Sequence, residues 1–312
     1  MTATIDVAVA ILIGADGRAL LAQRPAGKVY GGWWEFPGGK IEPGETTAHA
    51  LARELHEELG VEVERAYPWI TRVFTYPHAR VRLHFFRVLA WRGEPHGREG
   101  QAFAWQDLRA LTVGPVLPAN GPVLKSLALP TEYAISNAAE VGEARFLASL
   151  EARLAAGLRL VQLREKALPR DRLAALARRV VAAAGRYGAI VLVNGDAALA
   201  REVGAHGVHL TARQLADAAA RPALEWVGAS CHTAAELRSA EGLGADFAVL
   251  GPVAATPTHP DVPTLGWDGF EASAREAAIP VFALGGLRRI DLARAWSCGA
   301  HGVAMIRGAW EM

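Results

Sequence analysis

From Tyr133 onward, short apolar runs alternate with stretches of helical length that are rich in alanine, leucine and arginine. Apolar runs of this kind predict parallel strands buried on both faces and joined by crossover helices. Eight runs within residues 133–312 favour a closed (β/α)8 TIM barrel, with an open doubly wound sheet as the alternative. The predicted strands are Tyr133–Ser136, Leu158–Leu163, Ile190–Val193, Gly207–Leu210, Trp226–Ala229, Phe247–Gly251, Pro280–Gly285 and Gly302–Ile306.

The chain before this barrel predicts a second domain of a different kind. With 312 residues the chain is longer than one ordinary domain, and residues 1–129 mix strand and helix patterns. The turn signal Ala15-Asp16-Gly17 predicts a hairpin between the strands on either side of it. Strands are expected at Ile5–Gly14, Ala19–Gln23, Thr71–Tyr76 and Val81–Trp91, and a short closing helix within Pro115–Leu129. Pro130-Thr131-Glu132 predicts the boundary between the two domains.

The segment from Thr47 to Leu59 has the periodicity of an amphipathic helix. Thr46 or Thr47 can cap its start, and Gly60 stands where a left-handed C-terminal residue is expected. At about 100° per residue, three glutamates share one arc of this helix beside its apolar stripe. The stripe consists of Ala48, Leu51, Ala52, Leu55 and Leu59, and the arc consists of Glu54, Glu57 and Glu58.

These glutamates belong to a cluster of five carboxylates within seventeen residues, Glu42, Glu45, Glu54, Glu57 and Glu58. Like charges three or four residues apart destabilise an open helix by about 0.2–0.5 kcal/mol per pair. A divalent cation reverses the sign of that term, and oxygen ligands of this kind suit Mg²⁺ or Mn²⁺. The alternative is an acidic helix face that is simply solvated.

The complete pattern adds a family resemblance. The stretch Gly39-Lys-Ile-Glu-Pro-Gly-Glu45, followed after seven residues by Arg53-Glu-Leu-His-Glu-Glu-Leu-Gly-Val61, matches the Nudix box at every defined position. About residues 5–128 resemble the MutT-type Nudix hydrolases, which are 8-oxo-dGTP diphosphatases. The resemblance implies an α/β/α sandwich with a mixed sheet and a Mg²⁺-dependent enzyme, with Mn²⁺ as the alternative metal. It also implies attack of water on the β-phosphorus, which gives a nucleoside monophosphate and pyrophosphate.

The resemblance assigns roles to individual residues. It implies that Glu54 binds or deprotonates the attacking water and that Arg53 orients a carboxylate, with Glu45 as the candidate. The implied metal ligands are the carbonyl of Gly38 and the carboxylates of Glu54, Glu57, Glu58 and Glu99. The implied substrate contacts are Arg24, Glu35, Phe36, Pro37, Gly38 and Asn120. Phe36 can equally be core, and an asparagine such as Asn120 can equally be a turn or cap residue. Val29 stands where that family has a histidine.

The second domain resembles the thiamin phosphate synthase and TenI superfamily. The resemblance is carried by Gln162-Leu-Arg-Glu-Lys166, Leu192-Val-Asn194, Gly207-Val-His-Leu210, Gly228-Ala-Ser-Cys-His-Thr233, Thr256-Pro-Thr258 and Leu284-Gly-Gly286. These segments follow or end predicted strands, where barrel enzymes build their sites. A thiamin-related phosphate is the implied ligand. The candidate ligand residues are Gln162, Arg164, Lys166, Asn194, Ser230, Thr256, Thr258, Gly285 and Arg307.

Four departures from that superfamily concern the chemistry of the barrel. Where the synthases have two Mg²⁺-binding aspartates, this sequence has Gly195 and Gln214. His259 stands in place of a lysine, and Arg307 in place of a small phosphate-contacting serine. Without the two carboxylates, departure of a diphosphate loses its main electrostatic support. A barrel without synthase activity is therefore expected. The TenI tautomerase histidine aligns near Pro252 and is also missing.

Composition narrows the partners and the compartment. A formal charge of +1 gives no basic excess for duplex nucleic acid or for an acidic membrane surface. Cys231 and Cys298 have no metal-ligand spacing and fit a reducing compartment. We therefore expect a cytoplasmic protein without a signal peptide or membrane span that acts on a small-molecule nucleotide. The oligomeric state stays open. Two alternatives remain, namely a bifunctional thiamin-pathway enzyme and a barrel that senses a phosphate ester and regulates the hydrolase.

Overall fold

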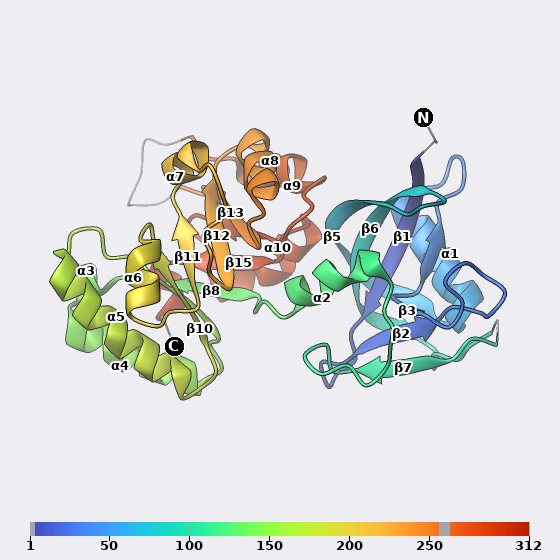
Figure 1. Cartoon of the computed structure of the whole chain (residues 1–312), viewed down its shortest axis with the longest axis horizontal. Helices are drawn as coiled ribbons and strands as arrows, with labels where there is room; N and C mark the ends of the chain where they lie inside the picture. Colours follow the sequence, from blue (N-terminus) through green and yellow to red (C-terminus); the bar gives the residue numbers. More distant parts are fainter. Residues whose placement is uncertain (1–3, 99, 256–262, 312) are drawn as a thin grey trace. The chain divides into compact units, whose positions relative to one another are not determined.

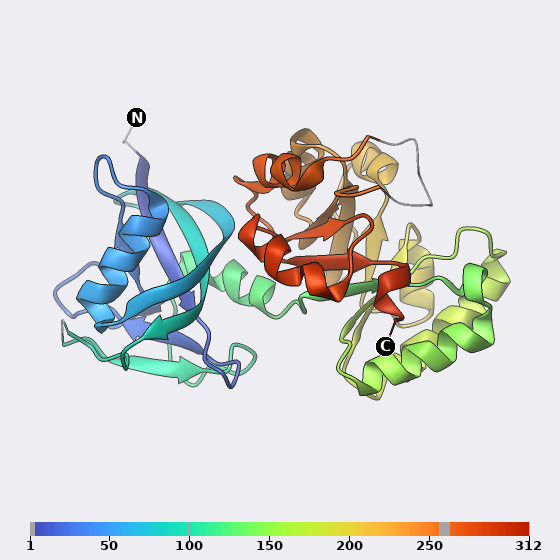
Figure 2. The ribbon, with the colours of Figure 1, turned by 180° about the vertical axis from the view of Figure 1, so that it is seen from behind.

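The computed structural model describes residues 4–98, 100–255 and 263–311. It divides into two compact units, Met1–Ala128 and Leu129–Met312. Figure 1 and Figure 2 show these units from opposite sides. Three of the predicted site residues, Glu99, Thr256 and Thr258, lie outside the described residues.

Two sheets make up the first unit. A mixed sheet has the order β4-β1-β6-β5, and an antiparallel sheet has the order β3-β2-β7. Strand β1 runs parallel to β6 and antiparallel to β4, and β5 runs antiparallel to β6. The strands are β1 (Thr4–Leu12), β2 (Ala19–Gln23), β3 (Trp34–Glu35), β4 (Gly38–Lys40), β5 (Glu62–Thr75), β6 (Arg80–Arg92) and β7 (Phe103–Gln106).

The predicted hairpin between the first two strands is wrong. Strand β2 pairs with β3 and β7, and within the described residues a lone bridge from Ile13 to Ala19 connects it with the end of β1. The reason is that both edges of β1 are occupied, one by β4 and the other by β6, so that β2 cannot continue the pairing beyond this bridge. The alternate side chains of β1 enter two separate apolar clusters, Val9 and Ile11 on one side and Ala8, Ala10 and Leu12 on the other.

Helices cover both faces of the mixed sheet. Helix α1 (Thr47–Leu59) has the bounds that the periodicity predicts, with the Thr46 side chain accepting from the His49 amide and Gly60 at φ 67°. Its buried side chains, Ala50, Leu51, Leu55 and Leu59, belong to the same apolar cluster as Ala8, Ala10 and Leu12 of β1. Figure 2 shows the helix lying over this face of the sheet. On the other face, η1 (Pro118–Asn120) and α2 (Gly121–Leu127) contribute Ala119 and Val123. This arrangement confirms the α/β/α sandwich.

The second unit is a closed parallel barrel in the order β10-β11-β12-β13-β14-β15-β8-β9. This confirms the barrel and excludes the open sheet. Its strands are β8 (Glu132–Ile135), β9 (Leu160–Leu163), β10 (Ile190–Asn194), β11 (Gly207–Leu210), β12 (Trp226–Cys231), β13 (Phe247–Leu250), β14 (Val281–Leu284) and β15 (Gly302–Met305). The helices around it are α3 (Ala138–Val141), α4 (Glu143–Ala155), α5 (Arg170–Gly185), α6 (Ala197–Glu202), α7 (Ala212–Asp217), α8 (Ala234–Leu243), α9 (Gly266–Ala274), η2 (Arg289–Asp291), α10 (Leu292–Ser297) and η3 (Arg307–Ala309).

The barrel interior is a packed layer of strand side chains. Tyr133, Phe247 and Phe282 are fully buried, and their ring centroids lie 5.3 to 5.6 Å apart. Such aromatic pairs add about 0.5–1.5 kcal/mol each beyond the burial of their area. This layer closes the middle of the barrel, so that a ligand can be received only at a strand end. None of the helices in the described parts of the chain combines the length and the apolar character that crossing a membrane requires.

Truncating Leu55 tests the packing of α1. Leu55 is 0% exposed, and Leu55→Ala should lower the free energy of unfolding of the N-terminal domain by about 2–5 kcal/mol because it leaves a cavity. The neighbouring exposed His56 provides a matched control, since His56→Ala should change it by less than about 0.5 kcal/mol. Calorimetry of the full chain measures both. Equal shifts in the two variants would contradict the packing described.

Candidate active site and ligand cavity

Two glycines let strand β4 approach helix α1 closely. A Cβ on Gly39 would lie 2.1 to 2.2 Å from the carboxyl atoms of Glu54, so that this carboxylate occupies the space a side chain would take. Gly38 has φ 144°, and a Cβ there would lie 2.1 Å from the Ala8 carbonyl oxygen. The Gly38 amide donates to Glu58 Oε2 at 3.2 Å. The glycine pair thus brings two carboxylates of α1 against the loop that precedes the helix.

Arg53 holds these carboxylates together. Its Nε and Nη2 donate to the two oxygens of Glu45 at 3.0 and 2.9 Å, which is the contact the sequence suggested. Its Nη1 donates to Glu54 at 2.9 Å and to Glu57 at 3.3 Å, and its Nη2 also reaches the Lys40 carbonyl at 3.0 Å. A planar guanidinium with five donors suits this task because it can serve several acceptors in one plane.

The electrostatics follow from this contact. Hydrogen bonds from Arg53 hold the pKa of the Glu45 carboxyl below its usual value, with help from the Glu42 amide. In turn, the carboxylates of Glu45 and Glu54 raise the pKa of Arg53. Glu54 is largely sheltered, since 17% of its side chain is exposed, whereas Glu57 is 55% exposed. One arginine therefore offsets part of the repulsion among three carboxylates.

The donor set fits a divalent cation. Glu54 and Glu58 lie against the loop at Gly38 and Gly39, and Glu57 is joined to Glu54 through Arg53, so that these carboxylates and the Gly38 carbonyl would supply oxygen ligands. Hard oxygen donors of this kind match Mg²⁺ or Mn²⁺. Among the described residues, no three or more Asp, Glu, His or Cys side chains are positioned so that they could together hold a metal ion. The guanidinium of Arg53 contacts Glu54 and Glu57.

Beyond this acidic cluster, Arg24 and Glu35 form an ion pair. Arg24 Nη1 donates to Glu35 Oε1 at 2.6 Å, and its Nε donates to the Val29 carbonyl at 2.9 Å. Burial raises the pKa of the Glu35 carboxyl, which Arg24 partly opposes. Val29 takes part in this contact through its backbone carbonyl. Its side chain, which stands where the resembled family has a histidine, makes no part of the contact and is 54% exposed.

The remaining predicted substrate residues are buried. Phe36 is 3% exposed and packs edge to face against Phe85, so that it lies in the core, the second of its two predicted environments. Pro37 is also buried, and its carbonyl accepts from the Ala10 amide. Asn120 is 4% exposed and ends η1, and at the start of α2 its side chain makes no capping hydrogen bond. Asn120 therefore stands at the turn and helix start that the sequence indicated, but its side-chain amide does not serve as the cap.

Sequence reasoning missed an aromatic group beside Arg24 and Glu35. The ring of Tyr30 contacts those of Trp33, Tyr76 and His78, and Tyr76 also contacts His78, with ring centroids 5.3 to 6.1 Å apart. Burial, with Glu35 close by, raises the pKa of Tyr76 to about 12. Tyr30 adopts φ 61°, which is uncommon for a residue with a side chain and fixes the end of the loop from Arg24. The sequence signal was weak, because these residues have no common periodicity.

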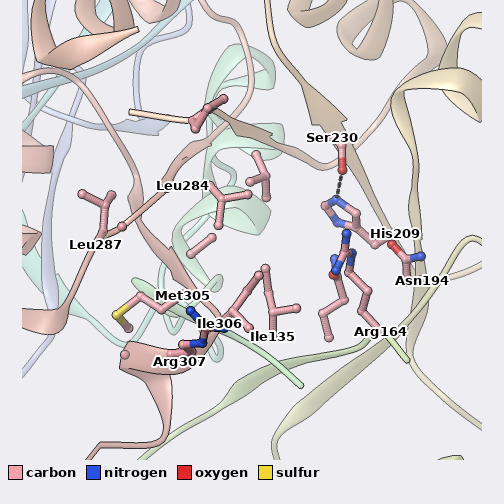
Figure 3. Close-up of a pocket in the computed structure, with 18 of the residues that line it drawn as sticks. Ile135, Arg164, Asn194, His209, Ser230, Leu284, Leu287, Met305, Ile306 and Arg307 are labelled. Atoms are coloured by element: carbon pink, nitrogen blue, oxygen red, sulfur yellow. Dashed lines mark hydrogen bonds between the residues drawn. The ribbon is translucent and has the colours of Figure 1, made fainter. Parts of the chain in front are cut away.

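The barrel has a cavity of about 660 Å³ at the C-terminal ends of its strands. The predicted ligand residues that the structure describes all line it: Gln162, Arg164, Lys166, Asn194, Ser230, Gly285 and Arg307. Figure 3 shows Arg164, Asn194, His209 and Ser230 on one side and Leu284, Leu287 and Met305 on the other. The first side is the polar wall of the cavity, and the second side is apolar at Leu284, Leu287 and Met305 but also carries Arg307.

A buried chain of hydrogen bonds lies behind the polar wall. Gln162 Nε2 donates to the Tyr133 hydroxyl at 3.1 Å, and that hydroxyl contacts His209 Nδ1 at 3.2 Å. His209 Nε2 lies 3.0 Å from Ser230 Oγ. Burial lowers the pKa of His209 to about 3, so the imidazole is neutral at physiological pH. Tyr133 and His209 were missed as site residues, since their partners are distant in sequence.

A direct hydrogen bond joins Gly195 and Gln214, the two positions at which the synthases have aspartates. Gln214 Nε2 donates to the Gly195 carbonyl at 2.6 Å, and Gln214 Oε1 accepts from the amide and hydroxyl of Thr211. Asp196, the nearest carboxylate in sequence, caps α6 through the Leu199 amide and pairs with Arg170 at 2.6 Å. A Mg²⁺ ion does not fit this pair of positions, because an amide and a carbonyl already satisfy each other there.

Arg307 is engaged as well, since its Nε pairs with Glu140 at 2.6 Å. The other cationic residue on that rim, Arg288, lies 3.9 Å from Glu311. Of the described residues that line the cavity, Glu311 is the only carboxylate. For the other two cationic residues that line the cavity, Arg164 and Lys166, no ion pair is found with a carboxylate of the described residues.

Known proteins resemble the two halves separately. A family model described as NUDIX domain matches residues 3–127, and one described as thiamine monophosphate synthase matches residues 132–309. An 8-oxo-dGTP diphosphatase of Haemophilus influenzae is 40% identical over 123 residues, covering 39% of this chain and 90% of that protein. A CTP pyrophosphohydrolase of Escherichia coli is 38% identical over 118 residues, covering 38% and 87%. A thiamine-phosphate synthase of Thioalkalivibrio sulfidiphilus is 37% identical over 167 residues, covering 52% and 79%.

Replacing Arg53 tests the electrostatic account. In Arg53→Gln the pKa of Glu45 should rise towards its usual value, because the two strongest donors to its carboxylate are lost. A lowered pKa stabilises the folded state at pH values where the carboxyl is ionised, and this stabilisation is lost as the pH falls through the pKa. The free energy of unfolding of the variant should therefore fall less than that of the wild type when the pH is lowered through the range in which Glu45 titrates. Carbon NMR of the glutamate carboxyls measures the shift. Arg92→Gln, which affects an exposed pair with Glu64, is the control, and an unchanged Glu45 pKa in Arg53→Gln would contradict the account.

Proposed function

Because the chain belongs to the Nudix family through its N-terminal domain and to the thiamine monophosphate synthase family through its C-terminal domain, we propose that the N-terminal domain hydrolyses 8-oxo-dGTP to 8-oxo-dGMP and pyrophosphate. The Nudix domain makes this half a hydrolase of nucleotide diphosphate bonds. The proposal rests on the position of Glu54. Its carboxylate occupies the space that a side chain on Gly39 would take, and it accepts a hydrogen bond from Arg53.

Hydrolysis of a triphosphate requires that negative charge be neutralised and that a water be deprotonated and aimed. The Gly38 carbonyl with Glu57 and Glu58, joined by Glu99, would hold the divalent cation that supplies charge neutralisation. Mg²⁺ is the proposed ion, with Mn²⁺ as a substitute. The remaining work falls to protein side chains.

Glu54 is the proposed base. It is sheltered from solvent, fixed by Arg53 and close to the loop that bears the metal ligands. It takes a proton from a water whose oxygen attacks the β-phosphorus, and the bond from that phosphorus to the α–β bridging oxygen breaks. The water oxygen leaves in pyrophosphate, and the bridging oxygen leaves with the monophosphate. Arg53 acts as a positioning residue because it fixes the carboxylate rather than touching the substrate.

Asn120 is the proposed reader of the base. Its amide can donate and accept at once, so it can pair with a carbonyl and a ring N–H on the edge of an oxidised guanine. Asn120 is 4% exposed, so a bound base that leaves its amide without a hydrogen-bond partner would cost about 1–3 kcal/mol of binding free energy. This cost penalises bases whose edge does not match the amide. Arg24 and Glu35, with Phe36 and Pro37 behind them, complete the proposed nucleotide pocket. This edge chemistry favours the purine over CTP, the substrate named for the relative in Escherichia coli.

For the barrel we propose no synthase activity. The hydrogen bond from Gln214 to Gly195 supports this, because it replaces the two carboxylates on which a metal-assisted departure of diphosphate depends. The same observation weakens the alternative of a bifunctional thiamin-pathway enzyme. The full chain with Mg²⁺ should form no thiamin phosphate from a pyrimidine diphosphate and a thiazole phosphate, and turnover would overturn this assignment.

Neutralising the proposed base tests the hydrolase. Glu54→Gln should lower kcat for 8-oxo-dGTP by about 10²–10⁴-fold, since loss of a general base removes that much acceleration. Release of pyrophosphate by the full-length protein with Mg²⁺ measures the rate. Glu62→Gln, an exposed residue at the start of β5, is the matched control and should leave kcat unchanged. Activity retained in Glu54→Gln would refute the role of Glu54.

Removing the Asn120 amide tests the choice of base. Asn120→Ala should reduce the ratio of kcat/KM for 8-oxo-dGTP over dGTP by about 5- to 100-fold, because the lost amide discriminates between the base edges. Hydrolysis of dGTP should change less, which separates recognition from damage to the fold. If both substrates slow equally, Asn120 is structural and the base is read elsewhere.

A further inference from the structure

Tyr76 is a neighbour of Asn120, although the two residues are far apart in the sequence. Tyr76 follows β5, and its amide donates to the Ala79 carbonyl at 2.8 Å across the turn that leads to β6. Its hydroxyl accepts from the backbone amide of Ala119, the residue that precedes Asn120 in η1. Tyr76 and Ala119 also pack in the same apolar cluster. A phenol and a side-chain amide thus lie close together in the N-terminal domain.

The ring of Tyr76 is held by three aromatic neighbours. Its centroid lies 4.6 Å from that of Phe74 and 5.5 Å from that of Tyr30. The ring of His78 stacks on it, also at 5.5 Å. A side chain whose rotamer is locked by packing can present a polar group at a defined position. The Tyr76 hydroxyl is therefore placed well enough to distinguish one ligand from another.

This hydroxyl can donate a hydrogen bond to a ligand. Burial, with the Glu35 carboxylate close by, raises the pKa of Tyr76 to about 12, so the group keeps its hydrogen at physiological pH. The amide of Ala119 occupies a lone pair of the oxygen and leaves the hydrogen available. Among the residues that the structure describes, none is found to accept that hydrogen. Tyr76 thus offers a donor next to Asn120.

Asn120 and Tyr76 together offer a particular set of hydrogen-bonding groups. The side chain of Asn120 supplies a donor and an acceptor, and the Tyr76 hydroxyl supplies a second donor. The complementary edge of a base has an acceptor, a donor and a second acceptor. Guanine presents two acceptors there, O6 and N7, and cytosine presents an amino donor. In 8-oxoguanine, oxidation puts a hydrogen on N7 and a carbonyl at C8, so that the edge carries acceptor, donor and acceptor in turn.

We propose that Tyr76 is a specificity-determining residue of the nucleotide site, and that its hydroxyl donates to the C8 carbonyl of an 8-oxopurine whose O6 and N7–H pair with Asn120. The contact with Ala119 positions the hydroxyl oxygen for this task. The inference rests on the proposed function, because it takes the base to lie at Asn120. It extends that function by assigning the oxidised carbonyl itself to a donor of the protein.

The variant Tyr76→Phe tests this assignment, because it keeps the ring and removes only the hydroxyl. It should lower kcat/KM for 8-oxo-dGTP by about 3- to 10-fold, the size of one neutral hydrogen bond, and change that for dGTP by less than about twofold. The substrate 8-thio-dGTP keeps N7–H but carries sulfur, a weaker acceptor, at C8, so its loss should be smaller than that of 8-oxo-dGTP. Release of pyrophosphate by the full-length protein with Mg²⁺ measures all three.

The comparison of substrates separates recognition from damage to the fold. Loss of the acceptor for the Ala119 amide affects all three substrates alike and cancels in the ratios of kcat/KM. Tyr187→Phe, which removes a hydroxyl bonded to Glu151 in the barrel, is the control and should change none of the rates.

The outcomes distinguish this inference from the proposed function. Equal losses for 8-oxo-dGTP and dGTP in Tyr76→Phe, or no loss for either, would overturn the role of Tyr76 and leave the proposed function standing. A wild-type protein with no preference for 8-oxo-dGTP over dGTP would overturn the proposed function, and this inference with it.

Discussion

Repulsion among the carboxylates around Gly39 is the constraint on which the N-terminal site depends. The helix gathers Glu54, Glu57 and Glu58 on one arc, and the glycine pair of β4 admits them against the preceding loop. Arg53 stabilises this arrangement through its contacts with Glu45, Glu54 and Glu57. The apolar stripe of α1 then fixes the whole group against β1, so that the position of the charges follows from the packing of the core.

The barrel has the opposite charge imbalance. Its polar wall presents Arg164 and Lys166, while the nearby carboxylates are engaged by backbone amides or by other arginines. Where the synthases are expected to hold a metal, an amide and a carbonyl bond to each other. One domain thus gathers negative charge that a cation would relieve, and the other gathers positive charge that an anion would relieve.

Much of the fold could be predicted from the sequence, because its elements have strong local patterns. Helix α1 has the bounds given by its periodicity and caps, and each of the apolar runs predicted from Tyr133 onward overlaps a barrel strand. The hairpin at Ala15-Asp16-Gly17 could not be predicted correctly, because the turn signal is local, whereas the two edges of β1 are occupied by β4 and β6, which lie further along the chain. Contacts such as Tyr133 with His209, or Arg24 with Glu35, depend on the closed fold and leave no spacing signal. Asn120 was correctly placed near a helix start, but its lack of a cap required the structure.

The most direct test of the central claim is a competition measurement. The full-length protein with Mg²⁺ is given equal amounts of 8-oxo-dGTP, dGTP and CTP, and the monophosphates formed are followed together by mass spectrometry. Consumption of each triphosphate then reports relative kcat/KM without separate assays. We expect 8-oxo-dGMP to accumulate well before dGMP or CMP. Preferential formation of CMP, or equal rates for 8-oxo-dGTP and dGTP, would contradict the assignment of the N-terminal domain as an 8-oxo-dGTP hydrolase.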